Sequence, residues 1–509
     1  MMFNIITIPY RILTGILIVG LLASGCNKNL EIDSSHLVNE GNNWKSITDT
    51  RSALLGTYGL LRAAMADNNG HWLYGDLRRG DFQATSRLDL KAIVGNNLNA
   101  PYPVVESLRS WRRFYAVINS ASLFIERAHE VMAKDKQYTE RNYKVDIAQM
   151  HALRAFAYFY MSRIWGDVPL ITSSKDGSFE NVARTPKSVV LGYAESELLK
   201  AVDNLPYKYG DVNDPVFPGL YYSQATANWS GVLLTKISAY AILAHIAAWN
   251  ERYIDASGYA SFVLTNFDKA GAAYTATANV SKYDGLFYDK KASQIFGLAF
   301  AWTDREASVV GHIEDLALAA PLVTKPVPQI YVPDQTILSI FNEDKDERFS
   351  INATTGRAVT DYFTNFGSSN TVFSKIKCIR DASSDGSLGL FSSAIVFTRL
   401  EEITLLYAES MAVIGNTQEA IDALDRIRIA RGLPLYQGAN DGVVDAIFKE
   451  RQRELMGEGW RWYDQIRYNR IKKTNPEFNK LISTNGIFWP ISEDVLSRNS
   501  LLVQNEYWR

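Results

Sequence analysis

The stretch TRLEEITLLYAESMAVIGNTQEAIDALDRIRIARGLP, residues 398–434, carries the clearest helical pattern of the chain. Its first half repeats apolar side chains at the spacing of one helix face: Leu400, Ile403, Tyr407, Met411 and Ile414. A second helical pattern starts at Asn416 and stops at Gly432, with Pro434 just beyond, which is a common C-terminal signal. A turn this short forces the two helices into an antiparallel pair. We also expect Thr398 and Glu401 to form a capping box.

Two other parts of the chain have the same build. Residues 231–249 with 253–266, and residues 141–165 with 187–204, each predict a pair of helices. Further helices are predicted at about 46–66, 105–134 and 444–468. The helix pairs are similar to tetratricopeptide repeats, whose period is about 34 residues, although insertions separate them here. The sequence therefore predicts a mostly α fold, a degenerate tetratricopeptide-like helix-hairpin scaffold with a loop-rich insertion containing short β-strands.

The insertion is predicted at about 267–397. There, short β-like runs such as 294–302 and 394–398 alternate with Gly, Ser, Asn and Asp. We assign the helical scaffold to about 46–266 and 398–470 and treat residues 46–509 as one domain.

The N-terminus predicts export and lipidation. An apolar stretch from Ile12 to Ala23 is too short to span a bilayer but fits a secretory signal, and Arg11 supplies its positive flank. Ser24 and Gly25 precede Cys26 as in a bacterial lipobox, with Ala23 in place of the usual Leu, Val or Ile. We predict a lipoprotein signal peptide at 1–25, lipid attachment at Cys26 and a flexible tether at 26–45. An ordinary cleaved signal peptide is the alternative.

Charge and motifs exclude several classes of function. The 53 basic and 55 acidic residues give a net charge of −2, without the basic excess that nucleic-acid binding requires. We find no G-x-S-x-G elbow, zinc helix or Walker loop, and the six histidines lack metal-ligand spacing. The run 344–348 lacks the spaced oxygens of a calcium loop. We expect no metal, no cofactor and no catalytic residues, so binding without turnover.

Several stretches, in order, carry a family resemblance: LRAFAYFY (153–160) before WGDVPL (165–170), RLEEITLLYAE (399–409), ERQREL (450–455), EGWRWYD (458–464), WPI (489–491) and QN (504–505). Together they resemble the SusD-like (RagB/SusD) family of nutrient-binding outer-membrane lipoproteins of Bacteroidetes. The resemblance spans nearly the whole mature chain.

The resemblance implies a cell-surface lipoprotein of the outer membrane that binds an oligosaccharide or polysaccharide. Such a protein acts as the lid of a SusC-like TonB-dependent transporter, to which it delivers the nutrient. The same role with peptides or another non-glycan nutrient is an alternative. A surface-anchored glycoside hydrolase is a further one, although no carboxylate pair is marked in the sequence.

Sugar rings stack on aromatic faces while their hydroxyls bond to polar side chains, so a glycan site is expected where aromatics stand in polar loops. The family resemblance places ligand residues in the early loop and in the insertion at about 267–397. The predicted stacking residues are Trp72, Tyr74, Tyr102, Tyr283, Tyr288 and Trp302, and the predicted polar ones are Arg78, Asp81 and Asn96. A third group, Tyr221, Tyr222 and Trp229, is ranked lower and is a candidate for contact with the transporter.

Three acidic–basic pairs lie three residues apart near the C-terminus: Glu450 with Arg453, Glu458 with Arg461, and Asp464 with Arg467. On helices such pairs interact with each other for a few tenths of a kcal/mol each. We interpret them as structural fasteners rather than as a catalytic array.

Replacing Cys26 by alanine is expected to release the protein from membranes, because the lipid on Cys26 is its predicted anchor. Fractionation of cells into membrane and soluble parts measures this. A Cys26→Ala variant that stays in the membrane fraction would contradict the predicted anchor.

Overall fold

The computed structural model describes residues 44–175, 180–301, 304–352, 354–356, 358–381, 389–439 and 442–509. The predicted signal peptide, Cys26 and most of the tether lie outside these ranges. Contacts within the chain separate Met1–Lys45 from a second unit, Ser46–Arg509, to which the described helices and strands belong. In the described part of the chain, no helix has both the length and the apolar character needed to cross a membrane.

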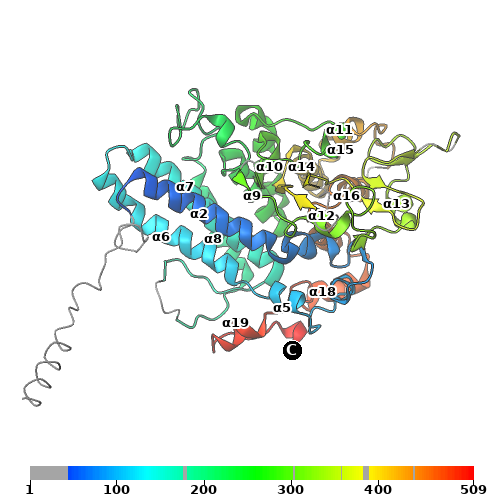
Figure 1. Ribbon diagram of the computed structural model, residues 1–509, viewed down its shortest axis with the longest axis horizontal. Helices are drawn as coiled ribbons and strands as arrows, with labels where there is room; N and C mark the ends of the chain where they lie inside the picture. Colours follow the sequence, from blue (N-terminus) through cyan, green and yellow to red (C-terminus); the bar gives the residue numbers. More distant parts are fainter. Residues whose placement is uncertain are drawn as a thin grey trace, which may run out of the picture. The chain divides into compact units, whose positions relative to one another are not determined.

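Antiparallel helix pairs form the framework of residues 46–509 (Figure 1). The pairs are α2 (Ile47–Ala66) with α6 (Arg112–Lys134), α7 (Glu140–Trp165) with α8 (Lys187–Ala201), α9 (Lys236–Trp249) with α10 (Tyr253–Asn266), and α14 (Leu400–Ile414) with α15 (Thr417–Ala430). They pack in chain order, since α6 contacts α7, α8 contacts α9 and α10 contacts α14. The predicted mostly α fold is confirmed.

Shorter helices join and follow these pairs. They are α3 (Gly70–Trp72), α4 (Leu88–Val94), α5 (Pro103–Leu108), α11 (Thr277–Val280), α12 (Ile313–Ala317), α13 (Asp334–Ile340), α16 (Val443–Glu454), α17 (Arg461–Lys472), α18 (Pro476–Ser483) and α19 (Glu493–Ser497). The sequence predicts the helices α2 and α6 but not their pairing, because residues 67–111 separate them.

The strands are short and pair two by two, all antiparallel. The pairs are β1 (Gln83–Ala84) with β3 (Ile330–Tyr331), β2 (Phe296–Leu298) with β10 (Ile395–Thr398), β4 (Ser350–Ile351) with β5 (Ala358–Val359), β6 (Phe363–Thr364) with β7 (Val372–Phe373), and β8 (Ile379–Asp381) with β9 (Leu390–Phe391). The two β-like runs predicted around residues 294–302 and 394–398 thus become partners, β2 and β10, which close the insertion onto the start of α14.

The predicted capping box is wrong. Arg399, not Thr398, is the N-cap of α14, and no side chain caps it. Thr398 Oγ1 instead donates to Glu402 Oε2 at 2.8 Å. Glu401 Oε2 lies 3.0 Å from the guanidinium of Arg399, so the two residues expected to cap the helix take part in buried polar contacts.

The predicted helix at 444–468 is divided into α16 and α17 at Gly457 and Gly459, whose φ angles are 79° and 81°. A Cβ on Gly457 would lie 2.5 Å from the ring of Phe373, and one on Gly459 would lie 2.5 Å from His71. Both the left-handed backbone and the close contacts require glycine here.

A buried ionic cluster centred on Glu454, the last residue of α16, joins four segments. The Glu454 carboxylate accepts hydrogen bonds at 2.7–2.9 Å from Arg348 of the insertion, Arg399 before α14 and Arg431 after α15. All four side chains are fully buried. Burial alone raises the pKa of Glu454, but the three guanidinium charges outweigh it and hold this pKa far below its usual value.

Two of the three predicted pairs exist, Glu450 with Arg453 and Asp464 with Arg467, each at 2.7 Å. The third does not, because Glu458 contacts Arg399 at 2.8 Å and Arg461 turns to Asp81. The two pairs that exist are buried, so their loss costs more than that of a surface pair.

Glu454→Gln is expected to lower the free energy of unfolding by about 3–5 kcal/mol, because the neutral amide leaves three buried guanidinium charges undercompensated. Urea denaturation followed by circular dichroism measures this. Asp494→Asn makes the same chemical change in an exposed pair with Arg112 at 2.9 Å and is expected to leave the midpoint near that of the wild type. Equal midpoints for the two variants would contradict the role of Glu454.

Candidate functional site

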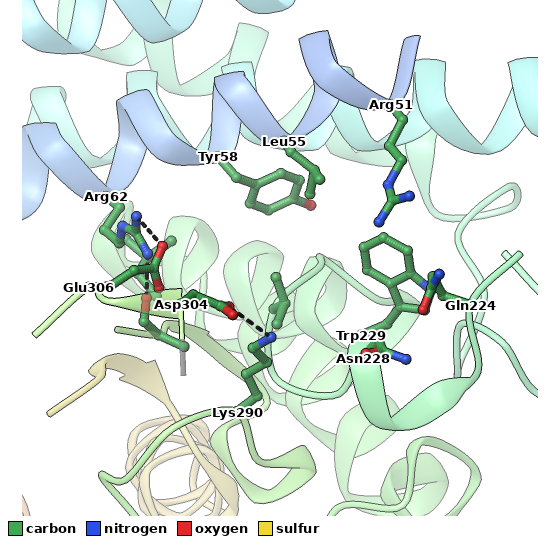
Figure 2. Close-up of a pocket in the computed structure, with 13 residues that line it drawn as sticks. Arg51, Leu55, Tyr58, Arg62, Gln224, Asn228, Trp229, Lys290, Asp304 and Glu306 are labelled. Carbon is green, nitrogen blue, oxygen red and sulfur yellow. Dashed lines mark hydrogen bonds and ion pairs between the residues drawn. The ribbon is translucent and has the colours of Figure 1, made fainter. Parts of the chain in front are cut away.

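A cavity of about 390 Å³ lies between α2, the loop before α9 and the insertion (Figure 2). Helix α2 contributes Arg51, Leu55, Tyr58 and Arg62, which recur at helical spacing on one face. Three segments distant in sequence converge on this cavity. Gln224, Asn228, Trp229 and Val232 come from the loop, and Lys290, Leu298, Ala299, Asp304 and Glu306 come from the insertion.

The insertion is tied to α2 by charge. Arg62 reaches Glu306 at 2.7 Å and donates to the carbonyl of Ala299 at 2.8 Å. Burial alone raises the pKa of Glu306. The hydrogen bond and charge of Arg62 outweigh this and hold the pKa of Glu306 below its usual value. Elsewhere on the rim, Lys290 lies 3.7 Å from Asp304. Both acidic side chains that line the cavity thus face cations.

Trp229 provides the aromatic wall. It is 4% exposed, so the cavity meets only part of its ring. The indole N–H is already used, donating to the carbonyl of Tyr221 at 3.1 Å, so toward a ligand Trp229 offers ring surface rather than a hydrogen bond. The Arg51 guanidinium lies 5.9 Å from the ring centroid, within the range of a cation–π contact. Figure 2 shows Arg51 and Gln224 flanking this ring.

Behind the cavity, one buried carboxylate supports the Trp229 wall. Asp146 of α7 accepts hydrogen bonds from the hydroxyls of Tyr138 at 2.8 Å, Tyr222 at 2.7 Å and Tyr221. Tyr221 in turn holds Trp229 through its carbonyl. Burial raises the pKa of Asp146 to about 7, and the three tyrosine hydrogen bonds offset part of that rise.

The wall formed by α2 is held through Gln149, one turn further along α7. Its amide nitrogen donates to the Tyr221 hydroxyl at 2.7 Å, and its amide oxygen accepts from Tyr58 of α2 at 3.0 Å. Tyr58 and Trp229 are therefore linked to the same buried network. Such a network fixes the walls before any ligand arrives.

The early-loop aromatics predicted to stack on a ligand are core residues. Trp72 and Tyr74 are 3% and 4% exposed, and the Tyr74 hydroxyl donates to the carbonyl of Leu108 at 2.7 Å. The segment predicted to be a loop is helical at residues 70–77 and packs against α17. These two predictions are corrected, because both rings are enclosed by the fold and neither lines the cavity.

The predicted polar residues of this loop also have structural partners. Arg78 is fully buried over the ring of Trp462, 4.1 Å from its centroid, and its side chain donates to two backbone carbonyls near residue 487. Asn96 accepts from Arg78 Nε at 2.9 Å. Asp81 accepts from Gln452 at 2.8 Å and lies 3.0 Å from Arg461 Nε. Arg78 is fully buried, so its predicted ligand contact is corrected too, whereas Asp81 and Asn96 are half-buried and their ligand contacts stay predictions.

Three further predicted aromatics, Tyr102, Tyr283 and Tyr288, do not line this cavity. Tyr102 is half-buried, directly before α5. Tyr283 is 55% exposed, and half-buried Tyr288 is covered by Arg380, whose guanidinium lies 3.9 Å from its ring centroid. Trp302 lies outside the described residues, between Ala301 and Asp304 in sequence, and its role stays a prediction.

From the sequence, the segment of Trp229 ranks below the early loop and the insertion as a ligand site. No site residue is predicted in α2. A signal was present in the spacing of Arg51, Leu55, Tyr58 and Arg62, which puts two cations and an aromatic on one helix face. Tyr221 and Tyr222 are buried, and Trp229 lines the cavity. Their segment therefore contributes both core residues and a wall of the site.

Across the ranges that the structure describes, no group of three His, Cys, Asp or Glu side chains is arranged to hold a metal ion. Asp346, in the acidic run 344–348, is fully buried against Arg348 at 2.7 Å. His245 contacts Glu402 at 2.9 Å, and His151 contacts Glu197 at 2.7 Å. These side chains have partners inside the fold.

Relatives are found by sequence and by structure. A family model described as the SusD family matches residues 339–508. SusD-like protein P38 of Formosa agariphila is 26% identical, with 99% of each chain covered. The crystal structure of a SusD superfamily protein from Bacteroides thetaiotaomicron is 46% identical, covers 92% of this chain and 100% of its own, and superposes with a TM-score of 0.84. A SusD homolog from the same organism superposes at 0.74 with 22% identity, covering 91% of this chain and 99% of its own.

Asp146 is expected to titrate near neutral pH and to move Trp229 as it does. Because its folded-state pKa of about 7 lies above its ordinary 3.8, its contribution to stability falls as pH rises from about 3.8 to about 7 and is constant above. Protonation gives Asp146 a hydrogen to donate, which forces the Tyr221 and Tyr222 hydroxyls to rearrange.

Fluorine NMR of protein labelled with 5-fluorotryptophan measures this, with the Trp229 signal assigned from its absence in Trp229→Phe. We expect that signal to shift with a midpoint near pH 7 in the wild type and to be independent of pH in Asp146→Asn. A wild-type Trp229 signal that stays fixed through neutral pH would contradict the linkage.

Proposed function

The chain belongs to the SusD family, and from this premise we propose that it is a cell-surface glycan-binding lipoprotein that delivers its ligand to a SusC-like TonB-dependent transporter and acts as its lid. Members of the family are binding proteins rather than enzymes and are associated with the outer membrane. The ligand class, the lipid anchor and the transporter partner are the proposed parts.

The observation that carries the proposal is the composition of the cavity. Two aromatic rings, Trp229 and Tyr58, lie among two arginines, a lysine and two side-chain amides. A sugar needs this combination, because its C–H face packs on an aromatic ring while its hydroxyls take and give hydrogen bonds. The volume of about 390 Å³ lies within the usual range of ligand pockets, about 300–1,000 Å³, so part of a longer glycan fits.

Arg51 has a place in this binding mode. Its half-buried side chain lies over the Trp229 ring, of which only a small part is exposed. A sugar therefore reaches more of the indole face when Arg51 swings aside. In its new position the guanidinium can donate to a sugar hydroxyl, so the cation–π contact is exchanged for a hydrogen bond.

The carboxylates of the cavity favour binding over hydrolysis. A glycosidase needs one carboxyl group that stays protonated near neutral pH and a second that is free to act as base or nucleophile. Here Glu306 is paired with Arg62, which keeps the pKa of Glu306 low, and Asp304 faces Lys290. Neither is arranged as a general acid.

Delivery to a transporter rests on family membership and on the predicted anchor at Cys26. A lipid at the end of a tether would hold the binding domain beside outer-membrane proteins while it captures ligand outside the cell. Energised import would belong to the transporter, so the binding protein itself needs no nucleotide or metal.

Isothermal titration or affinity electrophoresis of the chain from Asn27 onward, against plant, host and microbial polysaccharides, tests the ligand class. Binding of one polysaccharide without release of reducing ends supports the proposal. Release of reducing ends would establish a hydrolase. If no polysaccharide of the panel binds and peptides do, the ligand is a peptide, which is the alternative nutrient.

Trp229→Ala is expected to weaken binding of that polysaccharide about tenfold to a hundredfold, because it removes the aromatic wall. Trp229→Phe, which keeps a ring, is expected to retain most of the affinity. Trp302→Ala is expected to weaken binding as well, because Trp302 lies two residues before Asp304 in the chain. Thermal denaturation of each variant shows whether the fold survives.

Tyr283→Ala is the matched control. Tyr283 is an exposed aromatic of the insertion that does not line the cavity, so its loss is expected to leave affinity unchanged. Weakened binding in Tyr283→Ala with normal binding in Trp229→Ala would move the site from the cavity to the outer surface of the insertion.

A further inference from the structure

A groove of about 490 Å³ lies between α16 and α17 and reaches the start of α18. It shares no lining residue with the cavity beside Trp229. The α17 wall presents Arg461, Gln465 and Asn469, which are spaced four residues apart and so lie on one helix face. The α16 wall includes Lys449 and Gln452.

Two acceptors in the α17 wall lack donors. The side-chain oxygens of Gln465 and Asn469 are buried and accept no hydrogen bond from the described part of the chain. Their amide nitrogens are engaged, Gln465 with the carbonyl of Arg79 at 3.2 Å and Asn469 with the backbone carbonyl of Gln465 at 2.8 Å. The Asn469 side chain is only 5% exposed. Buried oxygens without donors cost free energy, which a ligand that donates hydrogen bonds recovers.

The facing wall carries a cation. Lys449 is exposed on α16 and has no ion-pair partner among the described residues. Tyr468 also lines the groove, and its hydroxyl donates to Asp445 at 2.9 Å, which leaves the ring as the group available for packing. The groove thus combines unpartnered acceptors, a cationic donor and aromatic surface.

The rim of the groove is fixed by a residue of the early loop. Asp81, predicted from the sequence to bind ligand, accepts from Gln452 of α16 at 2.8 Å and lies 3.0 Å from Arg461 of α17. One carboxylate therefore fastens both walls at one end. A groove held open in this way is preorganised for a ligand.

We propose that the groove between α16 and α17 is a second binding site for a short saccharide, a proposal that rests on the proposed function for its ligand class. A sugar hydroxyl donates and accepts through the same oxygen. Hydroxyls of one ligand accept from Lys449 and donate to the Gln465 and Asn469 oxygens once each amide turns toward the groove that its residue lines. Two separate sites on one protein hold a long glycan more tightly than either does alone.

Saturation-transfer NMR with maltose, cellobiose, xylobiose and lactose tests the groove in Trp229→Ala protein, whose first cavity lacks its aromatic wall. We expect at least one disaccharide to receive saturation there. In a titration, adding Lys449→Ala or Gln465→Leu is expected to weaken that binding about tenfold, because each removes one hydrogen-bonding partner. Lys480→Ala, which changes an exposed lysine of α18 that does not line the groove, is the matched control and is expected to change nothing.

If none of the disaccharides receives saturation in Trp229→Ala, the groove is not a saccharide site. The proposed function still stands in that case if the wild type binds its polysaccharide. Transfer that neither Lys449→Ala nor Gln465→Leu alters overturns the groove as well. If Trp229→Ala binds the polysaccharide as well as the wild type does, while Lys449→Ala weakens binding, the groove stands and the proposed first cavity fails.

Discussion

The buried ionic cluster around Glu454 fastens the loop-rich insertion to the helical scaffold. It lies at the end of α16 and collects guanidinium groups from the insertion, from the start of α14 and from the end of α15. Because the side chains are fully buried, each charge is stable there only while its partners are present. The loop-rich insertion, whose described strands are two to four residues long, is thereby fixed against helices that form the scaffold.

Because the insertion is held in place, it can form one wall of the cavity beside Trp229. The strand pair β2–β10 leads from the cluster toward residues 298–306, and Arg62 then ties the insertion to α2 through Glu306. On the other side, the buried network of α7 holds Trp229 and Tyr58. The cavity walls come from three segments, yet each wall is anchored to a long helix.

Much of the fold is accessible from sequence, because helix periodicity and end signals are local. The hairpins built from α7 to α10 and from α14 and α15 are predicted in this way. The split between α16 and α17 is not, since it depends on contacts of Gly457 and Gly459 with distant side chains. The site is predicted poorly. Trp72 and Arg78 stand in a polar stretch of sequence that suggests exposure, but the C-terminal helices cover that stretch.

The helical scaffold and the family resemblance are readable from the sequence alone, because each depends on local patterns of neighbouring residues. The lipoprotein N-terminus and the bounds of the insertion stay predictions from the same kind of pattern. Only the tertiary structure decided which aromatics are core and which line a cavity. Trp72 and Trp229 both stand among polar residues in the sequence, and both are largely buried. What separates them is which distant segments pack against them, and that depends on long-range contacts that no local pattern encodes.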